Sequence, residues 1–350
     1  STGEDEQEGE TTRPQSYSKA NLEAAKALTR RPLPLPPFST EPLPPPAEEY
    51  RHVSLKDLAR FWKTPCEYFL RQRIGMDVWE QSDLLPDREM LEPGGLEKYQ
   101  LRIRLTKLLQ SEDGQSAQTK VEKAKDTLRK EGLLPPGEPG EALFHEILVE
   151  AEDFLQTLNP YVSIEKLPSH GFSEKIGLFE LTGEVEPMHG NTLLAGRPAI
   201  TKAKDLMEGW ILHLAANAFG PFLGDTTTVV AGTEEQFTFS PSGQQEARDT
   251  LDRLLELYWE GLCRPLLFFP ETSSKWLETM RANEEVTEES GKRKDPLDAA
   301  RLKWEGGEHA SGEGRTFANR LCFPQDPFNE PEFTALAEEI LGKLKEQLAT

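Results

Sequence analysis

The sequence predicts a mixed α/β fold in which helices flank a central sheet. Three observations support it: apolar residues at helical spacing dominate residues 51–131, short runs with strand character follow between residues 162 and 240, and amphipathic helices return after residue 244. A chain of 350 residues is long enough for one large domain or two modest ones, and either can bury a substantial core.

The first predicted element is a pair of helices between residues 53 and 75. Ser54 is an N-cap residue, and Asp57 lies three positions on and forms a capping-box-like pair with it. Thr64-Pro65 interrupts the helix, or restarts it with proline in the first turn. The apolar residues of the pair are Leu55, Leu58, Phe61, Trp62, Tyr68, Phe69 and Ile74. We expect them to cover the core and not an active site.

Further helices complete the first layer. Tyr99–Leu109 places leucines on one side, and Lys120–Lys130 is a charged helix. Gly132–Gly137 interrupts the helical pattern, because glycine and proline break helices. A long helix then begins at about Glu141. We expect Asn159-Pro160 to end it, because the residue before a proline disfavours the helical conformation.

The sheet is predicted from the segments that follow. Val162–Leu167 alternates apolar and polar residues, and Ile176–Val185 contains a stretch buried on both faces. The remaining segments are the turn Met188–Thr192, the strand Thr192–Ile200, the apolar helix Ala203–Phe219 and the hairpin strands Thr226–Ala231 and Gln236–Ser240.

Helices close the chain. Gln244–Cys263 is amphipathic, Asn283–Asp295 is a charged loop that we expect to be mobile, and a last helix carries Phe333 to Leu344. Leu251, Leu254, Leu255, Tyr258 and Leu262 turn inward from the first of these helices. We expect an acidic, proline-rich tail or linker at residues 1–48, a helical subregion at 49–134 and a core with its C-terminal helix at 135–350.

The tail is expected to lack independent structure, because a segment rich in Pro, Glu and Thr buries little apolar area. A solvated linker is the simplest interpretation. Alternatively, Phe38 and Leu43 could anchor it as a strap across the parent subunit or a partner. The chain begins at Ser1 and not Met, so we expect a fragment of a longer polypeptide.

The net charge of −21 and the pI of 4.8 argue against a protein that binds DNA by itself, because its average field repels phosphates. Docking on partners that supply a positive channel fits better. Cys66, Cys263 and Cys322 are odd in number and far apart, which indicates a reducing cytoplasm and no disulfide framework. No apolar run has the length of a membrane span, so we expect no membrane partner.

The order Ser54-Leu-x-x-Leu-x-x-Phe61 followed by Pro65-x-x-Tyr-Phe69 and Ile74-Gly75 resembles the opening of nuclease-type domains in bacterial recombination helicase–nucleases. The closest resemblance is to the carboxy-terminal domain of the RecC family, the gamma subunit of exodeoxyribonuclease V. Further matching segments are Gly95–Gln100, Leu134–Glu141, Leu181–Glu184, Trp210–Ala215, Tyr258–Thr272 and Gly312–Arg315.

The resemblance implies a restriction-endonuclease-like fold (PD-(D/E)XK-type): a mixed sheet flanked by helices, with Gly183–Glu186 and Leu193–Pro198 on adjacent strands. An active relative needs an Asp on the first strand, an Asp or Glu and a Lys on the second, and Gln and Tyr on a following helix, so that carboxylates hold Mg²⁺ and the lysine helps to activate water. Here these three slots hold Glu186, Gly196 and Trp210, and we expect a catalytically degenerate domain that is not itself an enzyme.

The resemblance also implies the partners and the role. They are RecB-like and RecD-like subunits, with DNA held only within the complex, and the role is scaffolding and guiding DNA during double-strand-break repair and homologous recombination. Some relatives bind an iron–sulfur cluster through four cysteines, but Thr64 occupies the first of those positions here. We therefore expect no cofactor and no metal, with the three cysteines acting as small buried apolar residues.

Four other observations leave alternatives open. A basic cluster of Arg60, Lys63, Arg71 and Arg73 lies among aromatic residues and could contact DNA or a partner, although the aromatics share the buried face. Glu186 could combine with Glu180 or Glu184 in a nuclease whose carboxylates have migrated. The acidic charge and the proline-rich tail would also suit an interaction module unrelated to DNA. His213 is expected in the core, His189 at a turn tip, and His145-Glu146 lacks the second histidine of a zinc protease motif.

Overall fold

The computed structural model describes residues 18–29, 41–76, 93–110, 116–284, 293–307, 311–329 and 331–349. The chain forms two compact units, residues 1–36 and residues 37–350. In the first unit, α1 (Lys19–Thr29) lies inside the segment that the sequence analysis treated as a tail. Its Leu, Ala, Glu and Lys residues favour a helix, and the Ser18 hydroxyl accepts the Asn21 amide N–H at 3.3 Å. Phe38 and residues 285–292 of the expected loop lie outside the described residues.

The opening helices of the second unit form as predicted. They comprise η1 (Glu48–Arg51), β1 (His52–Ser54), α2 (Leu55–Lys63), α3 (Pro65–Phe69) and the π-helical turn η2 (Leu70–Ile74). The Ser54 hydroxyl accepts the Asp57 amide N–H at 3.0 Å, which confirms the N-cap. Residues before these helices also pack on the unit, since Leu43 touches the core and its N–H donates to the Cys263 carbonyl at 2.7 Å.

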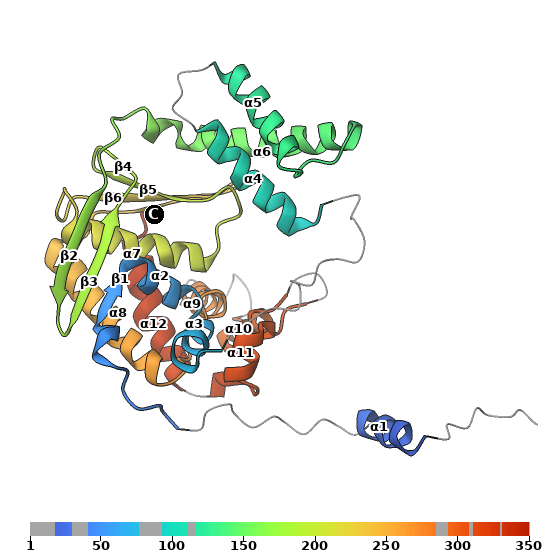
Figure 1. Ribbon diagram of the computed structural model, residues 1–350. Coiled ribbons are helices and arrows are strands. Elements are labelled where there is room, and N and C mark those ends of the chain that lie inside the picture. The colour runs from blue at the N-terminus through green and yellow to red at the C-terminus, as the bar shows by residue number, and fades with distance from the viewer. Residues whose placement is uncertain are drawn as a thin grey trace, which may run out of the picture. The chain divides into compact units, whose positions relative to one another are not determined.

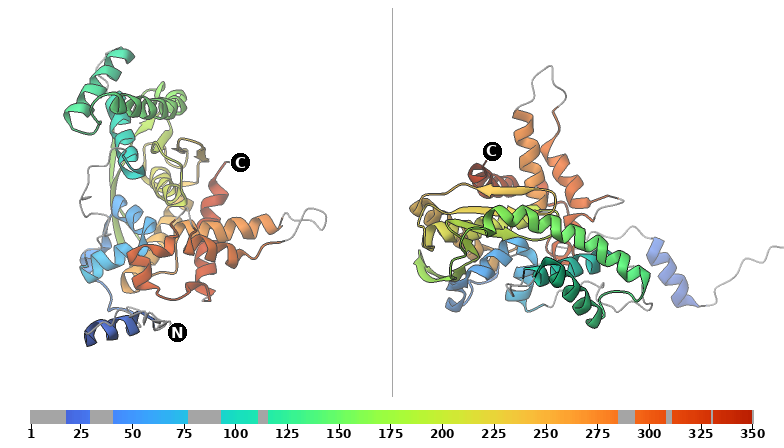
Figure 2. Two further views of the ribbon diagram at one scale, coloured as in Figure 1. Left: turned by 90° about the vertical axis from the view of Figure 1, so that its right-hand side faces the viewer. Right: turned by 90° about the horizontal axis from the view of Figure 1, so that it is seen from above.

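Helices α4 (Gly95–Leu109), α5 (Ala117–Lys130) and α6 (Glu138–Val162) share a hydrophobic cluster of their own, which lies away from α10 and α11 in the views of Figures 1 and 2. The expectation that Asn159-Pro160 ends the helix was wrong, because α6 continues to Val162. Pro160 lies in the last turn, where its missing N–H removes a single hydrogen bond. Residues 163–167 therefore form no strand, and only Lys166 makes a β-bridge, to His189.

Two small mixed sheets replace the single expected sheet. The first has the order β1-β3-β2 and the second β4-β5-β6-β7. Their strands are β2 (His170–Ile176), β3 (Phe179–Val185), β4 (Met188–His189), β5 (Thr192–Gly196), β6 (Thr227–Ala231) and β7 (Gln236–Phe239). The hairpin β6–β7 was predicted, whereas β2 was not.

Gly183–Glu186 and Leu193–Pro198 do not lie on adjacent strands, contrary to expectation. β3 pairs with β1 and β2, whereas β5 pairs with β4 and β6. Pro187 has no N–H to continue the first ladder, and β4 begins directly after it. The Pro187 carbonyl accepts the Leu194 N–H at 3.0 Å, so pairing with β5 starts one residue after Glu186.

Helix α7 (Ala203–Phe219) occupies the centre of the main core and packs against α2, α8 and β6 (Figure 1). The helices that enclose it are α8 (Gln244–Cys263), α9 (Pro270–Glu284), α10 (Pro296–Glu305), α11 (Phe317–Cys322) and α12 (Pro331–Gln347), with short 3₁₀ turns at η4 (Glu313–Arg315) and η5 (Pro327–Asn329). The inward residues predicted for α8 and for the last helix are buried. Among the described helices, none is long and apolar enough to cross a membrane.

Candidate functional site

The first nuclease slot lies at the end of β3. Gly183 leaves room for α2, because a Cβ at this position would lie 2.7 Å from the Leu55 Cβ. Glu186 follows the strand and is exposed. The alternative carboxylates Glu180 and Glu184 alternate with the buried residues of β3 and so share its outward face. Glu180 is bonded to the Ser173 hydroxyl at 2.8 Å and to His52 at 2.9 Å.

The second slot is closed by backbone. Gly196 has φ +123°, and a Cβ there would lie 2.1 Å from the Ala231 carbonyl oxygen and 2.6 Å from its nitrogen. The strand β6 thus occupies the space that any side chain would need. No carboxylate can be placed at Gly196 without moving β5 away from β6.

The nearest acidic group on the following segment is already bonded. Asp205 accepts two hydrogen bonds from Arg197, at 3.0 and 2.8 Å, and a third from the Lys202 N–H at the start of α7. The bidentate pair raises the pKa of Arg197 above its ordinary value. Arg197 also lies 5.2 Å from the ring centroid of Tyr99 on α4. This pair therefore joins β5, α7 and the three-helix cluster.

The third slot, Trp210, is part of the core. The indole is 1% exposed, and its N–H donates to the Gln347 side-chain oxygen at 2.6 Å. Gln347 also accepts the Ser240 N–H through its backbone carbonyl at 2.9 Å. Trp210 thus fixes the end of α12 against the strand β7.

Two other titratable groups with shifted pKa values lie away from the slots, one fully buried and one partly buried. His213 is fully buried, bonds the Thr228 hydroxyl at 2.9 Å, and has its pKa lowered to about 4 by burial. This confirms the expected core histidine. Glu313 accepts the Thr272 and Glu271 N–H groups at the start of α9, at 2.8 and 3.3 Å. Burial raises its pKa to about 7.

Within the described residues, His, Cys, Asp and Glu side chains form no group of three that could hold a metal ion. His189 differs from expectation, because it is buried in β4 and bonds the Ile164 carbonyl at 2.9 Å. Cys66 and Cys322 are buried beside each other, and their contact together with burial raises the pKa of Cys66. Cys263 is half-buried, so only two of the three thiols fit the buried expectation.

The basic cluster is not brought together around an exposed aromatic face. Phe61, Trp62 and Phe69 are each fully buried. The four basic residues bond to nearby groups: Arg60 to Asp57, Lys63 to Glu208, Arg71 to Glu67, and Arg73 to the carbonyls of Leu262 and Pro44. A stacking platform for bases would need these rings on the surface.

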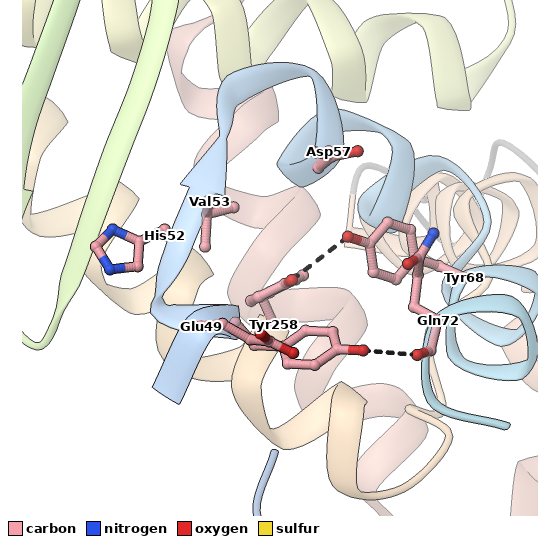
Figure 3. A pocket seen from close by; sticks show the side chains of 8 residues that line it. Glu49, His52, Val53, Asp57, Tyr68, Gln72 and Tyr258 are labelled. Atoms are coloured by element: carbon pink, nitrogen blue, oxygen red, sulfur yellow. Dashed lines mark hydrogen bonds between the residues drawn. The ribbon is translucent and has the colours of Figure 1, made fainter. Parts of the chain in front are cut away.

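A cavity of about 260 Å³, which the sequence did not predict, lies beside these helices (Figure 3). Tyr50, Tyr68 and Tyr258 line it together with Glu49, Asp57 and Gln72, which come from η1, α2, α3, η2 and α8. The Tyr68 and Tyr258 hydroxyls lie 3.4 Å apart, and Tyr50 donates to the Gln72 carbonyl at 2.8 Å. Tyr258 lies about 190 positions along the chain from Tyr68, so no local sequence pattern could have joined them.

Comparison with known proteins agrees with the sequence resemblance. Residues 50–281 match the family model described as the RecC C-terminal domain. The RecBCD enzyme subunit RecC of Escherichia coli K12 is 28% identical over 273 residues, which cover 76% of this chain and 22% of that protein. The subunit from Mycolicibacterium smegmatis is 25% identical over 289 residues, covering 79% of this chain and 25% of that protein.

The RecC of Buchnera aphidicola from Schizaphis graminum is 23% identical over 271 residues and covers 75% of this chain and 24% of its own length. The chain thus spans about a quarter of the length of the curated relatives that it matches. Because the family model covers residues 50–281, most of the second compact unit, this chain belongs to the RecC family and corresponds to its C-terminal domain.

Proposed function

We propose that this chain is a non-catalytic nuclease-like domain that scaffolds a RecBCD-type helicase–nuclease and guides DNA within it during double-strand-break repair. The observation that carries the proposal is the match of residues 50–281 to the RecC C-terminal domain. The proposed partners are RecB-like and RecD-like subunits in the cytoplasm, and the restriction-endonuclease-like ancestry of the fold is part of the proposal.

The geometry of the three slots supports the absence of catalysis. A magnesium site for phosphate hydrolysis needs carboxylates that converge on the ion together with the substrate phosphate. Glu186 lies on the surface, Gly196 has no room for a side chain, and Trp210 bonds Gln347 in the core. Gly196 and Trp210 thus serve the packing of the fold, and Glu186 has no packing role.

The charge of the chain supports a role inside a complex. Its net charge of −21 opposes free DNA, and the four basic residues of the opening helices bond to neighbouring acids and carbonyls. Partners would therefore have to supply most of the positive surface along the DNA path.

Two measurements test the proposal. An affinity-tagged chain should retain RecD-like or RecB-like subunits of the same organism during co-purification, and it should leave linear duplex and single-stranded DNA intact in Mg²⁺ or Mn²⁺. Retention of neither subunit would refute the scaffold. Metal-dependent degradation that disappears in Glu186→Ala would establish instead a nuclease with migrated carboxylates.

A further inference from the structure

The cavity beside the opening helices has the size for one side chain. Its volume of about 260 Å³ falls below the roughly 300–1,000 Å³ of typical small-molecule sites. The exposed residues Glu49, His52 and Gln72 line it, and the buried ring of Tyr258 from α8 forms part of its wall (Figure 3). A long side chain from another polypeptide could enter it, whereas a folded segment could not.

The cavity lining favours a cation. Three tyrosine rings and the carboxylates of Glu49 and Asp57 face it, and among the described residues no lysine or arginine lines it. Tyrosine faces attract cations, most strongly the flat guanidinium group of arginine. The same lining disfavours a phosphate, since the described residues of the wall include two carboxylates and neither a lysine nor an arginine.

The nearby arginines of this chain do not line the cavity. Arg73 lies 5.9 Å from the ring centroid of Tyr50, but its guanidinium bonds the Leu262 and Pro44 carbonyls. Arg51 pairs with Glu48 at 2.7 Å and lies 4.4 Å from the Trp259 ring centroid. Arg60 bonds one oxygen of Asp57 at 3.0 Å, and the Ser54 hydroxyl donates to the other at 2.6 Å. Asp57 is therefore partly neutralised, and the exposed Glu49 supplies most of the attraction. His52 points away from the tyrosines and pairs with Glu180.

The tyrosine hydroxyls add hydrogen-bond acceptors. The Tyr68 and Tyr258 hydroxyls lie 3.4 Å apart, so that one donates to the other, and burial raises the pKa of both phenols, so both stay neutral at ordinary pH. Each neutral phenol oxygen keeps lone pairs that can accept from a guanidinium N–H. An arginine would thus find a carboxylate at the rim and phenol oxygens with aromatic rings further in.

We propose that this cavity, walled by Tyr50, Tyr68 and Tyr258 with Glu49 at its rim, is a socket for an arginine side chain of a partner protein. The inference deepens the proposed scaffold role by giving a contact point for a partner, and it rests on that role for the existence of one. Assembly itself is tested by co-purification, whereas the socket is tested on the chain alone.

The experiment uses N-acetyl-arginine amide as the probe and N-acetyl-citrulline amide, which has nearly the same shape without the charge, as its control. The chain has six tyrosines, of which three line the cavity. Protein labelled with ¹³C on tyrosine therefore carries three reporters at the socket and three outside it. The arginine probe should shift the signals of Tyr50, Tyr68 and Tyr258 saturably and leave those of Tyr99 and Tyr161 in place.

Two matched variants distinguish binding in the cavity from a general attraction of the probe to the acidic surface. Glu49→Gln should weaken the arginine probe about two- to fivefold, the range of a solvent-exposed charge pair. Glu48→Gln changes the neighbouring residue, which pairs with Arg51 and does not line the cavity, and should leave the affinity unchanged.

Four outcomes would overturn the socket: no saturable shift at the three cavity tyrosines, equal shifts from the citrulline probe, equal weakening by Glu48→Gln, or stronger shifts from N-acetyl-phosphoserine amide. The last outcome would indicate an anion site. Each of these leaves the co-purification result standing, so the socket can fail while the scaffold role survives.

Discussion

Replacing Phe61 decides whether the opening helices belong to the core or form a surface for stacking bases. Phe61 is fully buried and makes edge contacts with the rings of Trp62, Tyr68 and Tyr258, at centroid distances of 5.4, 5.6 and 5.2 Å. The ring also packs against α8 so closely that a Cβ on Gly261 would lie 2.4 Å from it. Phe61→Ala therefore leaves a cavity that its neighbours cannot easily fill.

The expected cost is about 3–5 kcal/mol of unfolding free energy, the usual range for a buried Phe→Ala change. The upper half is favoured here, because three edge contacts of about 0.5–1.5 kcal/mol each belong to the same ring and are lost with it. Since whole domains are stable by about 5–15 kcal/mol, a large share of the stability would disappear.

Urea and thermal melts followed by circular dichroism measure the loss. Phe317 is the matched control, because it is the same residue type at 47% exposure, and Phe317→Ala should change stability by no more than about 0.5 kcal/mol. If Phe61→Ala unfolded at the same temperature and urea concentration as wild type, or if both variants lost the same stability, the core assignment would be wrong. An exposed position for Phe61, as in a surface that stacks bases, would then be the better interpretation.

Three further predictions concern DNA, the closed slot and pH. The chain alone should bind duplex DNA with a dissociation constant on the order of 10⁻⁴ M or weaker at physiological salt. A sub-micromolar dissociation constant in an anisotropy titration would contradict this and would indicate a local basic groove that outweighs the net charge. Gly196→Ala should destabilise by more than about 1 kcal/mol in urea melts, because of its positive φ and the Ala231 carbonyl, whereas Gly307→Ala, with open space around it, should not; equal effects would contradict the closed slot. Because the pKa of His213 is lowered, its contribution to the free energy of unfolding is fully present above about pH 6.5 and is lost as the pH falls towards 4. Because the pKa of Glu313 is raised, its contribution is fully present below about pH 4.5 and is lost as the pH rises through 7. The two slopes oppose each other between pH 4.5 and 6.5, so Glu313→Gln should make stability rise with pH there by about 1.4 kcal/mol per unit more than in wild type, and an unchanged slope would show that Glu313 titrates normally.

The helices were predictable from sequence because their signals are local. The N-cap at Ser54 and the apolar positions of Gln244–Cys263 depend on spacings of three and four residues, which the structure reproduces. β2 was missed because its exposed, polar pattern differs little from that of a loop. The end of α6 was misplaced because a proline in the last turn costs too little to stop the helix.

The pairing of strands could not be read from the sequence, and this is why the sheet was predicted as one. Whether Leu193–Pro198 pairs with β3 or with β4 depends on where the chain changes direction after Glu186, and the partner strand β6 lies about 35 residues further on. The cavity depends even more on distant residues, because Tyr258 from α8 completes a wall begun by η1 and α3.

The position of Gly196 has a different meaning in the structure than in the sequence motif. From sequence, Gly196 marks a position where a carboxylate is missing. In the structure it is a glycine with positive φ against the backbone of Ala231, held by the parallel pairing of β5 and β6. Restoring an acidic residue would first require those strands to separate, and Trp210 would still bind Gln347 in the core. The residues at two of the three positions stabilise the fold, so the packing of the domain itself opposes the assembly of a metal site there.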